Sequence, residues 1–419
     1  MVRIALPKDV KHIIDVLMEN GYEAYAVGGC VRDSILGRVP GDWDITTSAL
    51  PMQVKGLFRR TVDTGIQHGT VTVMLGRNGY EVTTYRIDGK YEDSRHPESV
   101  EFTPKLEEDL KRRDFTINAM AYNDEHGIVD IFDGVGDLQR KIIRCVGNAH
   151  DRFDEDALRI LRAVRFSAQL GFGIEENTAR AAKELAVNLK RISSERIHTE
   201  FNKMLKSPHP DYFSVADAIG IMEIVLPEYH VMSAEDKAFV GALARECACQ
   251  LPERYAAMLF MSGRYSEEDP AEDPADTAKR VLKRLKLDND TINTASMLLR
   301  FGMLEITDDE PRIRHIIYET GDKNILRILD FRAAYEKCIG NDITDVRRMY
   351  DICNMIFERG DCVSLKNLAI TGRELIAMGV PAGRQMGEIL NSLLMLVLDN
   401  PQLNDREQLS KEALKILNS

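Results

Sequence analysis

The stretch AVGGCVRDSILGRVPGDWDITTSA, residues 26–49, carries the pattern that decides the fold of the first part of the chain. Its small apolar start predicts a short strand that runs into Gly28 and Gly29, with a helix beginning near Val31. Paired glycines between a strand and a helix let backbone N–H groups approach a phosphate at the helix start. The pair by itself also fits a plain tight turn, which is the commoner structure.

The end of the same stretch, GDWDI, places the carboxylates of Asp42 and Asp44 on either side of Trp43. On a strand, residues two apart point to the same face. Two adjacent carboxylates repel each other, and a divalent cation between them removes that repulsion. Ligation by oxygen alone predicts Mg²⁺, which would also bind substrate phosphates. From the tripeptide alone, an acid pair in a turn or on a solvated edge remains an alternative.

A third acid, Glu81, lies in the segment YEVTTYR, whose alternation predicts a strand. A two-metal site for phosphoryl transfer holds its ions roughly 4 Å apart, one near the attacking hydroxyl and one near the leaving pyrophosphate. Glu81 is therefore a candidate third catalytic acid, and the alternative is an exposed strand residue.

The segment EDALRILRAVRF, residues 155–166, predicts one continuous helix with a single buried side. Its arginines recur at a strict spacing of three: Arg159, Arg162 and Arg165. One interpretation is a solvated face, because Glu155 and Asp156 stand four and three residues before Arg159 and such pairs contribute only about 0.2–0.5 kcal/mol. The other is a site that needs directed hydrogen-bond donors. The segment alone leaves both open.

Composition restricts the class of protein. The chain has 419 residues, 44% of them hydrophobic, and should form two to four domains. The seven scattered cysteines, the lack of an apolar run long enough to span a bilayer and the lack of a signal-peptide pattern predict a cytoplasmic protein. The net charge of −12 argues against a protein that coats nucleic acid non-specifically, but it allows a nucleic-acid enzyme with a local basic cleft.

Strand signals are confined to the first 150 residues, where they alternate with helical stretches such as residues 8–20. Beyond about Asn148, helical periodicity dominates, as in residues 177–192, 195–207 and 278–287. The sequence therefore predicts a mixed α/β N-terminal domain followed by a long all-α portion.

Several motifs in order resemble one family. They are the GGxVRD and DWDI motifs in residues 28–45, RRDFTINAM at 112–120, EDALRILRAVRFSAQLGF at 155–172, ISSERIHTEFNKML at 192–205 and a C-terminal segment at 365–394. Together they resemble the polymerase-beta-type nucleotidyltransferases, specifically the bacterial class II CCA-adding enzymes (tRNA nucleotidyltransferases) and the related poly(A) polymerases.

The resemblance implies a seahorse-like arrangement. Its parts would be a catalytic α/β nucleotidyltransferase head (1–147), a neck that selects nucleotides (148–212), a helical body (213–330) and a helical tail that binds tRNA (331–419). It also implies ATP, CTP and tRNA as partners, two Mg²⁺ ions as cofactors, and neither a membrane nor an obligatory protein partner.

Roles for single residues follow from the same resemblance. Asp42 and Asp44 match the metal-binding catalytic acids, with Glu81 as the third acid. The residues that match nucleotide-binding positions are Gly28, Gly29, Arg32, Arg113, Asp156, Arg159, Arg162 and Arg165.

The chemistry of base selection can be derived from the residues themselves. Cytosine and adenine both present an amino donor beside a ring-nitrogen acceptor, so a carboxylate and a guanidinium match both bases. Uracil and guanine reverse this pattern and would leave polar groups unpaired. Asp156 and Arg159 have the spacing to form such an edge without a nucleic-acid template. Arg162 and Arg165 would fix the fork of Arg159 or grip the triphosphate.

Other products remain possible at this level: a poly(A) polymerase, an enzyme that adds only CC or only A, or a non-catalytic RNA-binding protein with the same fold. The segment of residues 86–102 resembles the flexible loop of members that add all three nucleotides, with Arg95 and His96 as candidate substrate contacts. In the C-terminal segment, glycines stand four residues apart at Gly379, Gly383 and Gly387. They predict close helix packing or, alternatively, a helix start that meets an RNA phosphate.

Overall fold

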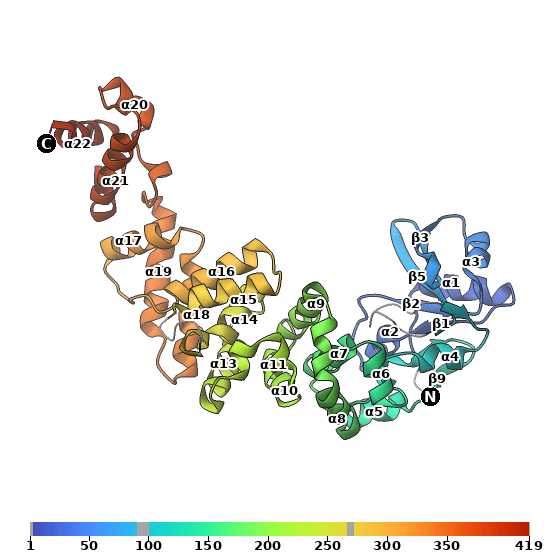
Figure 1. Cartoon of the computed structure of the whole chain (residues 1–419). Coiled ribbons are helices and arrows are strands. Elements are labelled where there is room, and N and C mark those ends of the chain that lie inside the picture. Colours follow the sequence, from blue (N-terminus) through green and yellow to red (C-terminus); the bar gives the residue numbers. More distant parts are fainter. Residues whose placement is uncertain (1–2, 90–99, 266–271, 419) are drawn as a thin grey trace. The chain divides into compact units, whose positions relative to one another are not determined.

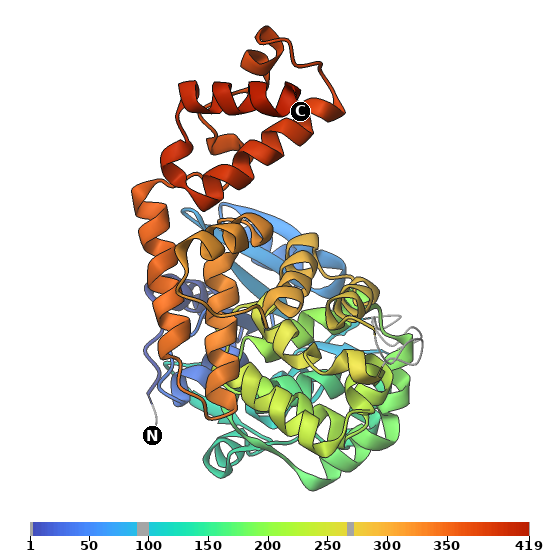
Figure 2. The same ribbon diagram turned by 90° about the vertical axis from the view of Figure 1, so that its left-hand side faces the viewer.

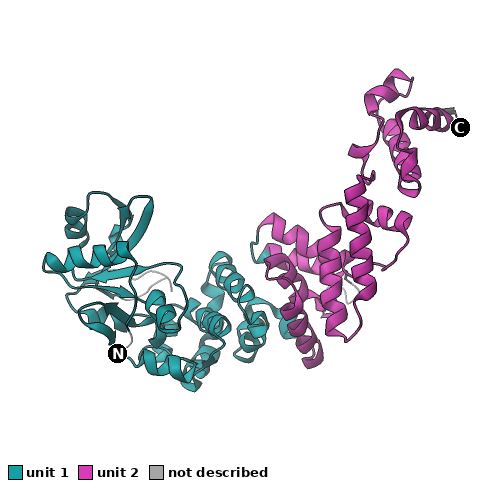
Figure 3. Ribbon diagram, turned by 180° about the vertical axis from the view of Figure 1, so that it is seen from behind, with its two compact units in different colours: residues 1–231, 284–287 teal, residues 232–283, 288–419 magenta. Residues whose placement is uncertain are grey.

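The computed structural model describes residues 3–89, 100–265 and 272–418, and they form two compact units (Figure 3). Unit 1 comprises residues up to Val231 together with 284–287, and unit 2 comprises the remainder. Strands occur only in unit 1 within the described ranges, so the predicted change from a mixed α/β region to an all-α region is confirmed.

The head contains a seven-stranded sheet (Figure 1). Its strands, in spatial order, are β3 (Thr61–Gly65), β4 (Thr70–Leu75), β5 (Asn78–Thr84), β2 (Asp44–Thr47), β1 (Ala24–Val27), β8 (Met120–Asn123) and β9 (Gly127–Asp130). Within this seven-stranded sheet, β2 and β5 pair in parallel and the other neighbouring strands pair antiparallel. The parallel pairing places the strand that begins at Asp44 beside the strand of Glu81.

Two short strand pairs complete the strands of unit 1. They are β6 (Arg86–Asp88) with β7 (Val100–Phe102), and β10 (Ile142–Ile143) with β11 (Gly173–Ile174). The first pair joins the two ends of the predicted flexible loop. Arg95 and His96 lie outside the described residues.

The helices of unit 1 accompany the sheet and then continue along the chain to His230. They are α1 (Lys8–Glu19), α2 (Gly29–Ile35), α3 (Pro51–Leu57), α4 (Leu106–Lys111), α5 (Gly134–Arg140), α6 (Ala149–Glu155), α7 (Leu158–Leu170), α8 (Glu176–Leu185), α9 (Ser194–Leu205), α10 (Phe213–Ala218), α11 (Ile221–Val225) and α12 (Pro227–His230). A core cluster that includes Tyr85, Leu110 and Val146 packs α4 against the sheet. The buried helix α7 packs against α9.

Unit 2 consists of helices. They are α13 (Ala234–Glu246), α14 (Leu251–Leu259), α15 (Pro274–Arg284), α16 (Asn289–Phe301), α17 (Glu310–Thr320), α18 (Ile325–Cys338), α19 (Thr344–Arg359), α20 (Gly372–Ala377), α21 (Arg384–Asp399) and α22 (Arg406–Asn418). Figure 2 shows α21 and α22 side by side near the C-terminus. None of the helices in the described ranges combines the length and the apolar character that crossing a bilayer requires.

Candidate active site

A cavity of about 370 Å³ in unit 1 brings most of the predicted site residues together. Its lining residues come from α2, from the segment before β2, from the RRDFT region and from α7. They include Gly28, Gly29, Arg32, Asp42, Asp44, Arg113, Asp114, Asn118, Arg162, Arg165 and Phe166. Glu81, Asp156 and Arg159 are not among the residues that line it.

Gly28 occupies a backbone conformation that only glycine adopts readily, with φ of 83° and ψ of −130°. A Cβ atom at this position would lie 3.1 Å from Nη1 of Arg113. The strand ends at Val27 as predicted, and α2 begins at Gly29, two residues earlier than expected. Because the N–H of Gly28 donates to the carbonyl of Met120, this amide is already engaged within the protein. Gly28 therefore contributes close backbone approach rather than a phosphate donor.

The three acids meet beside β2. Asp44 is the first residue of β2, whereas Asp42 precedes the strand, so the expectation that both lie on it is half correct. Ile45 pairs with Val82, so Asp44 and Glu81, one residue earlier on each strand, point to the same face. A second cavity, of about 750 Å³, is lined by all three carboxylates and shares Asp42 and Asp44 with the first.

The electrostatics of these acids suit a cation. Desolvation and the charge of Asp42 raise the pKa of Asp44 above its ordinary value, although Arg113 opposes the shift. Desolvation and the charges of Asp44 and Asp42 raise the pKa of Glu81. Among the described residues, no three His, Cys, Asp or Glu side chains form a complete metal-binding group. Mg²⁺ needs no such cage, because it retains waters and takes one or two carboxylates together with substrate phosphates. The oxygen donors present therefore fit a divalent ion.

Arg113 reaches the cavity from the end of α4, where the buried Asp109 holds it. Nη2 of Arg113 donates to Oδ2 of Asp109 at 3.3 Å, and Arg112 donates to Oδ1 at 2.8 Å. The hydroxyl of Thr46 on β2 donates to Oδ2 at 3.1 Å. Burial alone would raise the pKa of Asp109, but Arg113 and Arg112 hold it below its ordinary value. This carboxylate thus ties Arg113 to the strand that carries Asp44.

A second chain of polar contacts crosses the cavity from α2 to α7. Nη1 of Arg32 donates to Oδ1 of Asn118 at 2.6 Å, and the amide nitrogen of Asn118 donates to Asp114 at 3.1 Å. Arg162 donates through Nε and Nη2 to Oδ2 of Asp114 at 2.8 and 2.6 Å. Burial opposes ionisation of Asp114, but Arg162 and Asn118 lower its pKa to about 2.

The ring of Phe166 supports three of the arginines. The guanidinium carbons of Arg165, Arg32 and Arg162 lie 3.8, 5.0 and 5.4 Å from its centroid. Each distance is within the range of a cation–π attraction, which offsets part of the repulsion among the three cations. Phe166 in turn packs edge-on against Phe115, with centroids 5.8 Å apart.

The segment 155–166 is not the single helix that its periodicity predicts. The helix is interrupted at Asp156, whose backbone is extended (φ −145°, ψ 102°) between α6 and α7. Oδ1 of Asp156 accepts from the N–H of Leu158 at 3.0 Å, as a helix-capping aspartate does. Its Oδ2 accepts from Nη2 of Arg196 on α9 at 2.8 Å. These two contacts replace the helical backbone that the sequence pattern favoured.

The solvated-face interpretation of this segment is wrong. Arg159 and Arg165 are only 9% and 7% exposed, and the buried residues of α7 surround most of the helix rather than one side. Arg159 donates to Glu155 at 2.6 Å and to the backbone carbonyls of Arg152 and Arg112.

Arg162 and Arg165 do not fix the fork of Arg159. Arg162 binds Asp114, and Arg165 forms an ion pair with Glu200 on α9 at 2.6 Å. Both arginines line the cavity. Their other expected role, binding the triphosphate of the nucleotide, stays a prediction.

Sequence reasoning missed the residues that hold the arginines, which are Asp109, Asp114, Asn118, Phe166 and Glu200. It also missed Arg196, which holds Asp156. Signals for them were present, because most of them stand within the quoted motifs RRDFTINAM, EDALRILRAVRF and ISSERIHTEF. Their partners, however, lie up to 86 positions away in the chain, as for Arg32 and Asn118.

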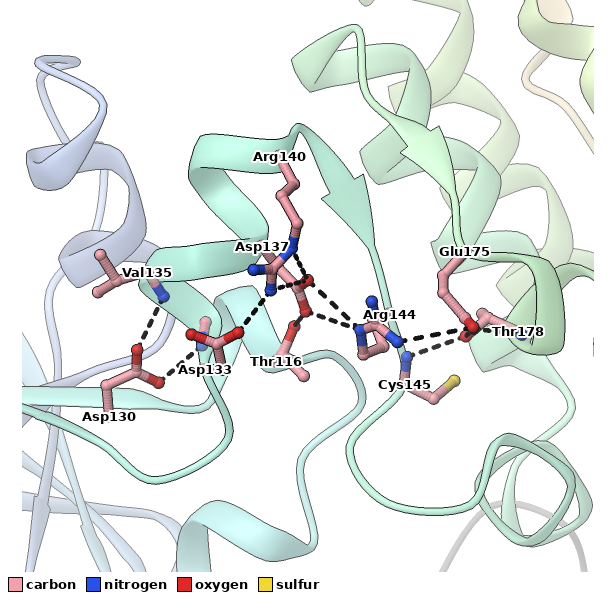
Figure 4. A network of polar contacts seen from close by, with 11 residues as sticks. Thr116, Asp130, Asp133, Val135, Asp137, Arg140, Arg144, Cys145, Glu175 and Thr178 are labelled. Carbon is pink, nitrogen blue, oxygen red and sulfur yellow. Dashed lines mark hydrogen bonds and ion pairs between the residues drawn. The ribbon is translucent and has the colours of Figure 1, made fainter.

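A similar buried aspartate, Asp137 on α5, lies outside the cavity (Figure 4). Asp137 accepts from Thr116 at 2.7 Å, from Arg140 at 2.7 Å and from Arg144 at 3.1 Å. Arg144 is also paired with Glu175, at 3.6 Å. Asp137 therefore has the same kinds of partner as Asp109, namely one threonine hydroxyl and two arginines. Unlike Arg113, the arginines that bind Asp137 do not line the cavity.

Comparison with known families agrees with this geometry. Residues 24–144 match the poly(A) polymerase head domain, residues 171–232 match a probable RNA- and SrmB-binding site of polymerase A, and residues 271–413 match a putative domain 2 of tRNA nucleotidyltransferases. The chain therefore has a head domain of the poly(A) polymerase type and a domain of the tRNA nucleotidyltransferase type.

Full-length relatives narrow the class. The chain is 37% identical to the CCA-adding enzyme of Lactiplantibacillus plantarum over 100% of this chain and 99% of that one. It is 36% identical to the CCA-adding enzyme of Enterococcus faecalis over 98% and 97% of the two chains. The crystal structure of the Bacillus stearothermophilus CCA-adding enzyme in complex with CTP is 32% identical, covers 97% of this chain and 96% of that one, and superposes with a TM-score of 0.79. The chain belongs to the CCA-adding enzyme family, which confirms the resemblance and the fold class predicted from the motifs.

Proposed function

We propose that this protein adds C, C and A in order to the 3′ end of tRNA, using CTP and ATP, releasing pyrophosphate and needing no nucleic-acid template. The observation that carries the proposal is the cavity in which Arg32, Arg113, Arg162 and Arg165 adjoin Asp42 and Asp44. A concentration of guanidinium groups beside two carboxylates suits a triphosphate with its metal ion.

In the reaction, the 3′ oxygen of the RNA forms a bond to the α-phosphorus of the nucleotide while the bond from that phosphorus to the β-phosphate oxygen breaks. Pyrophosphate leaves with the electron pair, and the hydroxyl proton passes to solvent. Asp42 and Asp44 would hold divalent ions, Mg²⁺ in our proposal, with Glu81 as the third acid; such ions neutralise charge on the phosphates. The arginines orient the triphosphate and stabilise the negative charge of the leaving pyrophosphate.

Base selection is assigned to Asp156 and Arg159. Because Asp156 bonds to Arg196 and Arg159 bonds to Glu155, both side chains are held in place by neighbouring charges. A base that offers an amino donor and a ring-nitrogen acceptor would add to these contacts. Uracil or guanine would place a carbonyl against a carboxylate.

The roles of the remaining parts follow the motif order. Residues 1–147 act as the catalytic head, 148–212 as the nucleotide-selecting neck, 213–330 as the body and 331–419 as the tail that binds tRNA. The protein acts in the cytoplasm. In the tail, a Cβ atom added at Gly379, Gly383 or Gly387 would meet no atom within 4 Å. Close packing within the chain therefore does not account for these glycines. The φ angles of 95° at Gly379 and 116° at Gly383 favour glycine for the backbone alone, and contact with RNA at the start of α21 is the role we propose in addition.

The test uses purified protein, Mg²⁺, labelled CTP or ATP, and tRNA transcripts that end before CCA or at CC, with an unrelated RNA as control. Addition of two C and one A to tRNA alone is the expected result, with loss of activity in a chelator. Long A tails on the unrelated RNA would indicate a poly(A) polymerase instead. Products that stop at CC would indicate a partial enzyme.

A further inference from the structure

Two cavities meet at the same two aspartates. The first lies toward α2 and α7, and the second lies toward the turn between β4 and β5. Glu81 lines only the second. In phosphoryl transfer the attacking and leaving groups lie roughly in line on opposite sides of the phosphorus. A reaction between two substrates at these acids therefore needs a binding site on each side of them, and the two cavities provide these two sites.

The linings differ in chemistry. Among the residues that the structure describes, four arginines line the first cavity, whereas Arg77 is the one arginine that lines the second, beside Trp43 and Tyr80. A triphosphate needs many cationic donors, but a single-stranded RNA end carries one negative charge per nucleotide and a base that stacks on aromatic rings. Oη of Tyr80 donates to Asp9 of α1 at 2.9 Å, which fixes this wall of the cavity.

We infer that the second cavity binds the 3′-terminal nucleotide of the RNA that is being extended, with Trp43 as a stacking surface and Arg77 as the contact to its phosphate. This inference rests on the proposed function. The terminal 3′ hydroxyl then lies beside Asp42, Asp44 and Glu81, and its oxygen attacks the α-phosphorus of the nucleotide held in the first cavity.

The first experiment uses fluorescence, because Trp43 is the only tryptophan of the chain. Emission is titrated with a tRNA transcript that ends before CCA, without nucleotide or divalent ion, so that binding occurs without reaction. Stacking of the terminal base predicts a saturable change in emission. A transcript shortened by several 3′ nucleotides should bind with a much smaller change. Identical responses to both transcripts would overturn the inference.

The second experiment separates the two cavities by steady-state kinetics. Arg77→Ala should raise KM for the tRNA by roughly tenfold, as expected for loss of a phosphate contact near a stacked base, and leave KM for CTP unchanged. Arg162→Ala should do the reverse. Arg60→Ala is the matched control, because Arg60 is an exposed arginine of the same domain that lines neither cavity. Arg77→Lys should restore part of the tRNA affinity.

Trp43 adjoins both aspartates in the chain, so its variants are compared with each other. Trp43→Phe retains a stacking ring and should keep most of the tRNA affinity, whereas Trp43→Leu should not. If the wild-type protein extends tRNA but Arg77→Ala and Trp43→Leu leave KM for tRNA unchanged, this inference is wrong and the proposed function stands. If the wild-type protein extends no RNA, the proposed function itself fails.

Discussion

Asp156 and Arg196 form a 2.8 Å hydrogen bond that joins the junction of α6 and α7 to helix α9. The other oxygen of Asp156 caps α7 through the N–H of Leu158. The carboxylate assigned to base selection is therefore held from two directions. A rigid acceptor rejects a carbonyl more strongly than a mobile one, because it cannot turn away from the mismatch.

Replacing Asp156 should relax the choice of nucleotide. In Asp156→Asn, the amide retains an oxygen for the cap but adds a donor, so UTP and GTP should be incorporated alongside CTP and ATP. Arg159→Ala should also lose discrimination. Single-turnover incorporation of each of the four nucleotides measures the effect. Unchanged selectivity for C and A in both variants would contradict the role assigned to this pair.

Asp109→Asn should weaken nucleotide binding by roughly tenfold, because the amide cannot balance the charges of Arg112 and Arg113 in a buried site. Calorimetric titration with CTP measures the affinity. Asp137→Asn is the matched control, since it alters a buried aspartate with a threonine and two arginine partners outside the cavity. Both variants should lose stability, but only Asp109→Asn should lose affinity. Equal affinities would show that Asp109 is purely structural.

Acid should remove the contribution of Asp114 to stability. Its pKa in the folded protein is about 2, below the ordinary value of 3.8, so the folded state binds fewer protons than the unfolded state between these values. The stabilisation, about 2 kcal/mol, is therefore present above pH 4 and is lost as pH falls toward 2. Urea unfolding of wild type and Asp114→Asn should differ most at neutral pH and converge on acidification. A constant difference would argue against the ion pair with Arg162.

Gly28→Ala should impair both stability and activity. The residue would be forced to a φ of 83°, which costs about 1–3 kcal/mol, and its methyl group would press on Arg113. The melting temperature and KM for CTP are the measurements. Gly37→Ala provides the comparison, since Gly37 also has a positive φ, of 69°, but no atom within 4 Å of an added Cβ. Gly37→Ala should therefore lose stability without a change in KM.

Local patterns in the sequence were sufficient for the order of elements and for selecting three acids that the structure brings to one cavity. The alternation in β5 predicted the face of Glu81, and the glycine pair predicted the turn from β1 to α2, because strand periodicity and backbone sterics act over a few residues. The family was also recognised from motif order, since several short motifs at the right spacing are specific together.

Only the tertiary structure decided which partners hold the functional side chains. The spacing of 155–166 predicted one continuous helix and left open whether its charges face solvent. In the structure, Arg196 and Glu200 on α9 and Asp114 pair with the charges of this segment, and the helix is interrupted at Asp156. A buried charge is costly unless an opposite charge pairs with it, and here the paired residues come from segments that are distant in the sequence. Periodicity determines which residues share a face, whereas the desolvation of charges in the assembled core determines what each of them binds.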